Sequence, residues 1–515
     1  MAIVNAAQAE IKTVGDPNAS YESLKPLWTR SKAVCSGERF VKDLDGIVST
    51  RNMLIPFSAS MTQTQYDFFK AEAELPGITA QFSKMLIGGL LRKTPVLTLP
   101  ESVPEDAHDW IINQFGQDDS QLVSVLDTAL WEEIRSSRCW IFVDYPSIDN
   151  VKVLSKEQRD ALKPYPIIME AESVINWRYS SDDMGKDLLS MIIVKGLRED
   201  FEKNEFHPTY IETVDVHDLD EAGLYRIRKY EKEAPSQNLP VVAGKKLQRN
   251  EKGVFILKET IETVQMNGQR LAFIPAWPLN GSVEPVEPIL STIIDKEISL
   301  YNKISRRNHL LYGAATYTPI ISSDMEKESF DEITEAGLGS WILLEKGDTA
   351  SVLATPTAAL QDMDRAIAAS IEEIAKLGIR MLTPETDQSG VALQLRNAAQ
   401  TAQLGTLNSK ISGTLKQIIA FMIEWRYDID MDPKDVDFSL SADFNPTPLG
   451  PDWLRLATEW YEGGKIPRSI WLTILKHNDI LSPDYDDNDG QKEINEDTLL
   501  NVNETDYMRK TQLKE

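Results

Sequence analysis

The sequence predicts an α+β fold that is mainly α-helical. Two observations carry this prediction: amphipathic stretches of helical period towards both ends of the chain, and short β-type runs between residues 139 and 277. With 515 residues and 42% hydrophobic content, the chain is long enough for several domains and a substantial core.

The first 135 residues are expected to be mostly helical. Apolar residues recur at helical spacing over residues 21–35, 63–91 and 104–135, with a break near Gly116. The pattern then changes to short runs that favour strands, at 139–145, 166–170, 188–194, 224–230, 254–261 and 271–277. Because polar loops separate these runs, we expect a mostly antiparallel and partly solvated sheet.

Two helices of similar length are expected on either side of a small domain. Residues 289–311 carry apolar side chains at helical spacing and predict a helix about 35 Å long. Thr355 and Pro356 suit the N-cap and first turn of a second helix, whose apolar stripe is Leu360, Met363, Ile367, Ile371, Ile374 and Leu377. Between them, the β-like segments TYTPII and SWILLE flank an acidic piece at 325–333 that is expected to be helical.

A loop and a long helix are expected next. Pro384 and Gly390 predict a polar loop at 379–390. Residues 391–427 contain no proline and predict a helix about 55 Å long, with a bend near Gly405 or Gly413 because glycine weakens a helix. A helical pair is expected at 453–462 and 468–476.

This order of parts resembles the portal proteins of tailed bacteriophages, in particular a podovirus-type subgroup. The segments YESLKPLWTRSKAVCSGERFV, ALWEEIRSSRCWIFVDYP, PIIMEAESVINWRYS and ETDQSGVALQLRNAAQTAQLGTL carry the resemblance, which covers nearly all of the chain. The last segment is the most specific, because portals commonly hold a Ser-Gly-Val-Ala-Leu motif where the tunnel loop meets the kinked helix. That motif is matched here by Ser389, Gly390, Val391, Ala392 and Leu393.

The resemblance implies a division of the chain into the parts of a portal subunit. A wing with the N-terminal helices and the β-rich part would span 1–285, the first stem helix 286–313, the clip 314–355 and the second stem helix 356–378. The tunnel loop would span 379–390, the kinked wing helix and its return 391–450, and the crown helices 451–483. Residues 484–515 form an acidic C-terminal tail that is expected to be disordered.

The resemblance also implies a function without catalysis. Portal subunits form a ring, of twelve copies in the family, around a channel at the capsid vertex through which double-stranded DNA is packaged and ejected. The implied partners are the terminase large subunit, head-tail adaptor and tail proteins, and the major capsid and scaffolding proteins. The protein would be made in the host cytoplasm and would reside in the virion.

Three groups of residues are candidates for the channel. The resemblance places a DNA-facing tunnel loop at Thr383, Glu385, Thr386, Asp387, Gln388 and Ser389, and the start of the kinked helix at Gly390, Val391, Ala392 and Leu393. Lys303, Arg306 and Arg307 form a basic cluster on the first stem helix that could touch the DNA backbone. The alternative for this cluster is salt bridges between subunits or a solvated face.

The charge of the chain argues against a surface that grips DNA. The formal net charge is -26, from 80 acidic and 54 basic residues, whereas binding to phosphates needs Lys and Arg to displace counterions. Twelve copies would sum to roughly -300, so the channel wall would mostly repel phosphate and let DNA slide.

Motifs for enzymatic chemistry are missing from the sequence. It contains no G-x-x-x-x-G-K-[ST], H-E-x-x-H, C-x-x-C or G-x-S-x-G motif, and its five histidines are scattered. No cofactor and no metal are therefore expected. Residues 485–496 resemble a calcium loop, but Tyr485 stands where a carboxylate is required.

The cysteine content and the hydropathy of the sequence indicate the cellular compartment in which the protein is expected. Cys35 and Cys139 are the two cysteines of the chain, and both are expected to be reduced and buried. The N-terminal segment has no basic flank before an apolar core, and no run approaches the roughly 18 apolar residues of a membrane span. We therefore expect neither export nor a membrane partner.

Two other functions are compatible with the sequence. One is a different structural virion protein, a capsid or connector protein, which would lack the series of helix, small domain and helix. The other is a metal-dependent nuclease, in which Asp144, Glu170 and Glu172 at strand ends would assemble a site. Loop-facing charges explain the same three residues.

Overall fold

The structure is a computed structural model that forms two compact units, residues 1–442 and residues 443–515. Each unit is considered by itself. The structure describes residues 13–44, 53–146, 162–181, 185, 187–201, 205–232, 255–261, 265–266, 269–315, 318–322, 347, 349–353, 358–377, 390–440, 451–477 and 480–481.

The N-terminal part of the first unit is helical, as expected. Its helices are α1 (Ala19–Ser36), α2 (Glu38–Leu44), α3 (Gln63–Glu72), α4 (Ile78–Leu90), α5 (Asp106–Asn113) and α6 (Leu122–Ser136). The single helix expected over 63–91 is wrong, because two helices occupy that stretch. Pro76 cannot donate a helical hydrogen bond, and Gly77 has a left-handed φ of 72° at the N-cap of α4.

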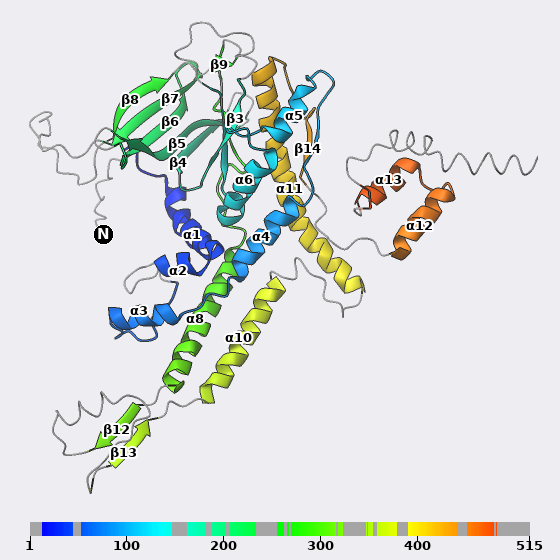
Figure 1. Ribbon diagram of the computed structural model, residues 1–515. Helices are drawn as coiled ribbons and strands as arrows, with labels where there is room; N and C mark the ends of the chain where they lie inside the picture. Colours follow the sequence, from blue (N-terminus) through cyan, green and yellow to red (C-terminus); the bar gives the residue numbers. More distant parts are fainter. Residues whose placement is uncertain are drawn as a thin grey trace, which may run out of the picture. The chain divides into compact units, whose positions relative to one another are not determined.

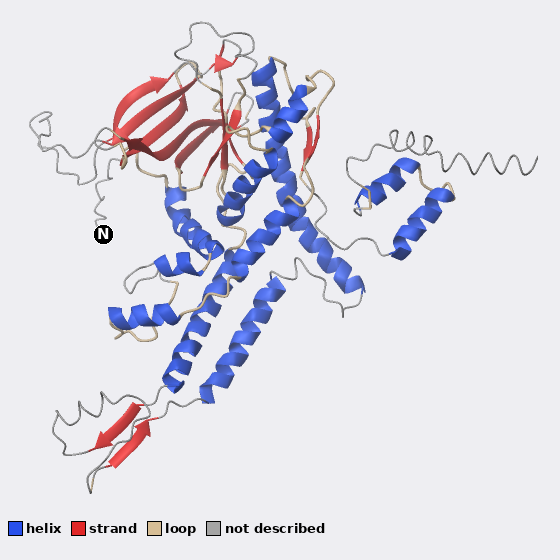
Figure 2. Cartoon of the chain, in the orientation of Figure 1, coloured by secondary structure: helices blue, strands red, loops and turns tan. Residues whose placement is uncertain are grey.

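Antiparallel sheets follow (Figures 1 and 2). The larger one has five strands in sequence order, namely β4 (Val174–Ser181), β5 (Asp187–Asp200), β6 (Thr209–Leu219), β7 (Tyr225–Lys232) and β8 (Phe255–Ile261). A three-stranded sheet has the order β11 (Ala276–Pro278), β2 (Trp140–Asp144), β3 (Tyr165–Met169). Every described strand pair is antiparallel, which confirms that part of the prediction.

Two short strand pairs were not expected from the sequence. β1 (Val96–Thr98) pairs with β14 (Asp437–Ser439), and β9 (Gln265–Met266) pairs with β10 (Gln269–Arg270). The strands β4 and β6 were also missed. β11 covers three residues of the run expected at 271–277.

The two helices expected around a small domain are α8 (Ser291–Ala315) and α10 (Ala358–Leu377). They lie side by side (Figure 1). Between them in the chain, β12 (Thr318–Ser322) contains most of the TYTPII segment and pairs with β13 (Thr349–Leu353). The N-cap expected at Thr355, the SWILLE segment and the helix expected at 325–333 lie outside the described residues.

The long helix α11 spans Gly390–Tyr427 and passes through Gly405 and Gly413 without interruption. The expected bend therefore stays a prediction. Its C-terminal half lies in the core, where Ile411, Leu415 and Ile418 are fully buried. Phe421 packs against Phe273 and Trp277, so this helix joins β11 to the body of the first unit.

The second unit contains the expected helical pair, α12 (Pro451–Glu462) and α13 (Arg468–His477). The rings of Tyr461 and Trp471 stack with centroids 4.7 Å apart and hold the two helices together. Gly464 has a φ of 69° in the turn between them. Residues 484–515, with the calcium-like segment, lie outside the described residues.

The thiols of Cys35 and Cys139 are free and buried, as expected. Among the described residues, no helix is both long enough and apolar enough to cross a membrane.

Candidate functional site

The α8–α10 pair is held by polar contacts along its length. Lys296 Nζ lies 2.6 Å from Glu373 Oε1, Lys303 Nζ donates to Ser370 Oγ at 2.6 Å, and Arg307 Nε donates to Asp364 Oδ1 at 2.9 Å. The numbers rise along α8 as they fall along α10, so the helices are antiparallel. Positions 296, 303 and 307 are seven and four residues apart, which places them on one face of α8.

The three residues of the predicted basic cluster, Lys303, Arg306 and Arg307, do not share one environment. Lys303 and Arg307 point to α10 and bind its side chains, whereas Arg306 is exposed and makes no ion pair with a residue that the structure describes. Within one subunit, Arg307 therefore forms a salt bridge and Lys303 a hydrogen bond to a neutral hydroxyl. Contact with DNA is untested for all three.

The N-terminal half of α8 is anchored in the body of the first unit by buried polar groups. Glu297 is fully buried, and its carboxylate oxygens accept hydrogen bonds from the backbone N–H groups of Ile78 and Thr79 at 2.8 and 2.7 Å. A carboxylate is favourable there, because the first amides of α4 lack helical partners. Asn302 donates to Met53 O at 2.7 Å and accepts from Ile55 N at 2.8 Å.

The loop before α8 is fixed by a second buried network. Arg138 is 1% exposed, donates to the carbonyls of Ser282 and Val283 at 2.5 and 3.0 Å, and lies 4.4 Å from the ring centroid of Trp140. Asn280 Nδ2 donates to Glu133 Oε1 at 2.9 Å. This network ties the loop to the end of α6.

Glu133 is the titratable group of this network. Its Oε2 accepts a hydrogen bond from Cys139 N at 3.0 Å, and its Oε1 accepts from Asn280. Burial raises the pKa of the carboxyl to about 7, against the opposite effect of these two donors. The charge of Glu133 is therefore sensitive to pH near neutrality.

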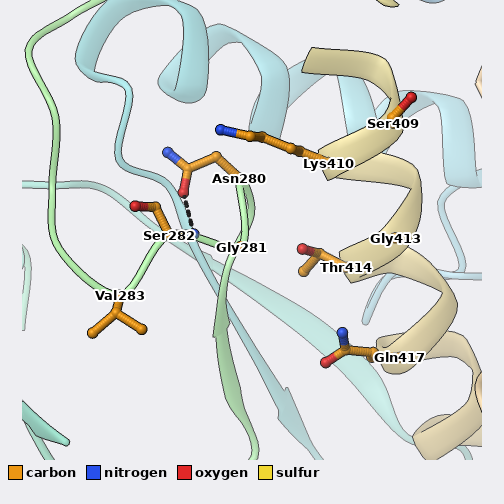
Figure 3. A pocket seen from close by; sticks show the side chains of 9 residues that line it. All are labelled: Asn280, Gly281, Ser282, Val283, Ser409, Lys410, Gly413, Thr414 and Gln417. Atoms are coloured by element: carbon orange, nitrogen blue, oxygen red, sulfur yellow. Dashed lines mark hydrogen bonds between the residues drawn. The ribbon is translucent and has the colours of Figure 1, made fainter. Parts of the chain in front are cut away.

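An open polar pocket of about 540 Å³ lies between the same loop and α11. Figure 3 shows Lys410 reaching towards Asn280, and Thr414 and Gln417 on the same side of the helix. Gly281 has a φ of 66° there, and a β-carbon on it would lie 3.4 Å from Thr414 Oγ1. The remaining lining residues are Ser282, Val283, Ser409 and Gly413. The pocket lining holds no carboxylate, His or Cys, so it has no side chains of the kinds that usually hold a metal.

The residues predicted for the tunnel loop, Thr383, Glu385, Thr386, Asp387, Gln388 and Ser389, lie outside the described residues. The helix start is described for its backbone alone. Gly390 is the first residue of α11, not the last residue of the loop, and Val391, Ala392 and Leu393 follow in the first turn. The predicted boundary is therefore one residue late.

The nuclease site considered as an alternative, from Asp144, Glu170 and Glu172, is not assembled in the structure. In the register of β2 and β3, Asp144 is opposite Tyr165 and Trp140 is opposite Met169, so Asp144 lies about 13 Å from the end of β3 where Glu170 follows. The reason is the antiparallel register, which separates the two strand ends.

Glu170 and Glu172 instead gather with Glu132 of α6. One carboxylate oxygen from each lies within 4.8 Å of the others. The ammonium group of Lys32 binds all three, with Nζ 2.8 Å from Glu132 Oε1 and 3.0 Å from Glu170 Oε2. This protein cation takes the position that a metal would need, so the cluster joins α1, α6 and the β3–β4 turn. Glu132 was missed because its spacing in the sequence is that of an ordinary helix residue.

Comparisons with known proteins give limited matches. Residues 290–426 match a family model described as "Domain of unknown function (DUF4055)", which covers the chain from α8 through all but the last residue of α11. No curated protein matches the chain.

Two similar solved structures are of virion particles. "Virion of native gene transfer agent (GTA) particle" has 8% sequence identity and a TM-score of 0.35, and the match covers 75% of this chain and 85% of that chain. "Neck of empty GTA particle computed with C6 symmetry" has 10% identity and a TM-score of 0.37, with 79% and 92% covered. TM-scores this low do not establish a common fold.

Proposed function

We propose that this chain is a portal subunit, the structural protein that forms a ring channel for double-stranded DNA at the capsid vertex. The observation that carries the proposal is the antiparallel pair α8–α10, which brackets the β12–β13 hairpin and precedes the long helix α11. This is the order of stem helix, clip, stem helix and wing helix that the portal resemblance implies. The family match over 290–426 supports treating these elements as one unit.

In this proposal, α8 and α10 are the stem helices, the β12–β13 region is the clip, and residues 379–390 are the tunnel loop. The wing comprises residues 1–285 and the helix of 391–450 with its return, and α12 and α13 form the crown. The chain belongs to a podovirus-type portal of twelve copies. It is a virion component that receives DNA from the terminase large subunit and docks head-tail adaptor and tail proteins, with the major capsid and scaffolding proteins around it.

The wall of the channel is proposed to let DNA pass without gripping it. Lys303 and Arg307 are engaged by α10, so Arg306 is the member of the basic cluster that remains available to touch a phosphate. A net charge of -26 in each copy repels phosphate over the rest of the ring. Binding to DNA should therefore be weak and independent of sequence.

The chain is proposed to have no enzymatic activity. Among the residues that the structure describes, the carboxylate cluster with the spacing of a metal site is neutralised in part by Lys32. Incubation of the purified protein with linear DNA and Mg²⁺ or Mn²⁺ should leave the DNA intact, and reproducible cleavage that a Glu170→Gln variant loses would contradict the assignment.

Electron microscopy of the purified protein tests the main proposal. We expect rings of about twelve copies with a central hole, and α8 and α10 around the hole after three-dimensional reconstruction. Particles without a hole, or rings in which this helix pair lies on the outer rim, would instead favour another structural virion protein.

A further inference from the structure

One side of α11 forms a wall of the open pocket beside the loop before α8 (Figure 3). Ser409, Gly413 and Gln417 follow one another at intervals of four residues. Lys410 and Thr414 lie one position further on, also four residues apart, so all five share one side of the helix. A β-carbon on Gly413 would meet nothing within 4 Å. The wall therefore presents polar side chains around an unfilled centre.

The opposite wall, the loop at residues 280–283, is held in place by its own hydrogen bonds. Asn280 Nδ2 donates to Glu133 Oε1 and to Ser137 O, both at 2.9 Å. Asn280 Oδ1 accepts from the backbone N–H of Ser282 at 2.9 Å. The loop therefore has its shape before a ligand arrives, and a preformed site loses little conformational entropy on binding.

Two polar groups of the pocket have no partner within the described part of the chain. Lys410 is exposed and makes neither an ion pair nor a hydrogen bond there, whereas Lys416 on the same helix lies 3.2 Å from Asp437 Oδ1. Thr414 is 4% exposed, and its hydroxyl, which faces the loop, likewise has no hydrogen-bond partner among the described residues. Because a nearly buried hydroxyl without a partner is unfavourable, a ligand that accepts its hydrogen bond is stabilised there.

The charge and the donors of the pocket match a carboxylate. Lys410 carries the one charge of the pocket lining, and Thr414 and Gln417 add neutral donors. A single ammonium group balances the single charge of a carboxylate, whereas a phosphate group carries nearly two charges and a DNA surface needs several basic residues. The volume of about 540 Å³ is far larger than a carboxylate, so the chain that carries the carboxylate also has room.

We infer that this pocket binds a Glu or Asp side chain in an acidic peptide segment of a partner protein. Lys410 Nζ pairs with the carboxylate, and Thr414 Oγ1 and the amide of Gln417 donate to it or to the neighbouring peptide group. The inference goes beyond the proposed function, because it concerns one pocket of the first unit and requires neither a ring nor DNA.

Disulfide capture of short peptides tests the inference at low affinity. Ser409→Cys places a thiol at an exposed position of the pocket wall, and the native Cys35 and Cys139 are buried. The acetylated and amidated peptides Cys-Gly-Glu and Cys-Gly-Gln compete for this thiol in the presence of β-mercaptoethanol, and mass spectrometry of the intact protein measures each mixed disulfide. We expect at least about fivefold more of the Glu peptide, from its charged hydrogen bond to Lys410.

Matched variants separate the pocket from a simple effect of charge. Met85→Cys places a thiol beside Lys84, which is exposed on α4 outside the pocket, and its preference for the Glu peptide should stay below about twofold. Added to the pocket thiol, Lys410→Met should abolish the preference, and Gly413→Leu should block it by filling the centre of the pocket. Gly405→Leu, on the same helix but outside the lining, should leave the preference unchanged. A β-carbon on either glycine meets nothing within 4 Å, so both variants should fold.

Three results would overturn the inference. They are equal capture of the two peptides by the pocket thiol, a preference of the same size beside Lys84, and a preference that survives Gly413→Leu. A phosphoserine peptide of the same length that is captured more than the Glu peptide would overturn the assignment to carboxylates. Each of these results leaves the portal proposal standing, because the capture of a peptide does not depend on ring formation.

Discussion

Replacement of Lys32 by methionine should destabilise the first unit strongly, because Lys32 is the cation at the centre of three carboxylates. Its side chain is 15% exposed, and that of its partner Glu132 is 3% exposed. Burial opposes the charged form of Lys32, but Glu132 and Glu172 raise its pKa above the usual value. The ammonium group therefore stays charged over the whole range in which the protein would be handled.

The magnitude follows from the geometry around Glu132. Burial raises the pKa of this carboxyl, against the opposite effects of Lys32 and of the Ala171 N–H, which donates to Oε1 at 2.8 Å. Without Lys32, burial raises the pKa of Glu132 further, because one of the two groups that lower it is gone. Removing one partner of a buried ion pair costs about 3–5 kcal/mol. We expect the lower end, about 3 kcal/mol at neutral pH, because Glu170 is 64% exposed and can turn to solvent.

Urea unfolding followed by tryptophan fluorescence measures this effect, since Trp28 is fully buried on the same helix. The free energy of unfolding that Lys32→Met loses should be smaller at lower pH, because Glu132 then takes up a proton in the variant. The control is Lys25→Met at an exposed position of α1, with a change within about 0.5 kcal/mol. A Lys32→Met loss below about 1 kcal/mol, or an equal loss at pH 5 and pH 7.5, would refute the reasoning.

Three further predictions concern the same unit. First, the free energy of unfolding should fall by roughly 3 kcal/mol as pH rises from 4.5 towards about 7, because Glu133 has a higher pKa in the folded than in the unfolded chain. Urea titrations of a Glu133→Gln variant should not show this fall with pH. Second, Mg²⁺ should leave the melting temperature of the wild type unchanged in calorimetry, because Lys32 takes the centre of the carboxylate cluster; a rise of several degrees would contradict this. Third, hydrogen exchange in the unassembled chain should be faster in α10 than in residues 291–302, since α10 has one buried side chain among those described.

The sequence predicts the helices of this protein better than its strand pairs, for physical reasons. Leu290, Ile294 and Ile298 repeat at the period of a helix, so local spacing is sufficient to locate α8. The strand β6 carries Thr209, Tyr210 and Glu212 among its exposed or half-buried residues, and it pairs with β5 over ten residues, from Asp200–Thr209 to Met191–Asp218. This pairing is a tertiary contact that is not visible in the local sequence.

The residues of the candidate site could be predicted only in part, again because the sequence shows local patterns and not tertiary contacts. The basic cluster at Lys303 and Arg307 stood out by composition, yet its partners Ser370 and Asp364 lie 67 and 57 residues away. Of the Lys32 cluster, the sequence indicated Glu170 and Glu172, whereas Lys32 and Glu132 gave no signal because they come from α1 and α6. A site that is assembled from distant elements becomes visible once the packing of those elements is known.

The polar anchors of α8 explain why one helix can serve both as part of a core and as part of an exposed pair. Apolar packing alone would tolerate a helix that slides by a turn, since Ile294, Ile298 and Tyr301 repeat along one stripe. Glu297 and Asn302 remove that freedom, because each is buried and can satisfy its hydrogen bonds with one set of backbone groups. A slide would bury these groups without partners, at about 1–3 kcal/mol each. The direction in which α8 leaves the body is therefore fixed by its first three turns, and the remainder of the helix can pair with α10.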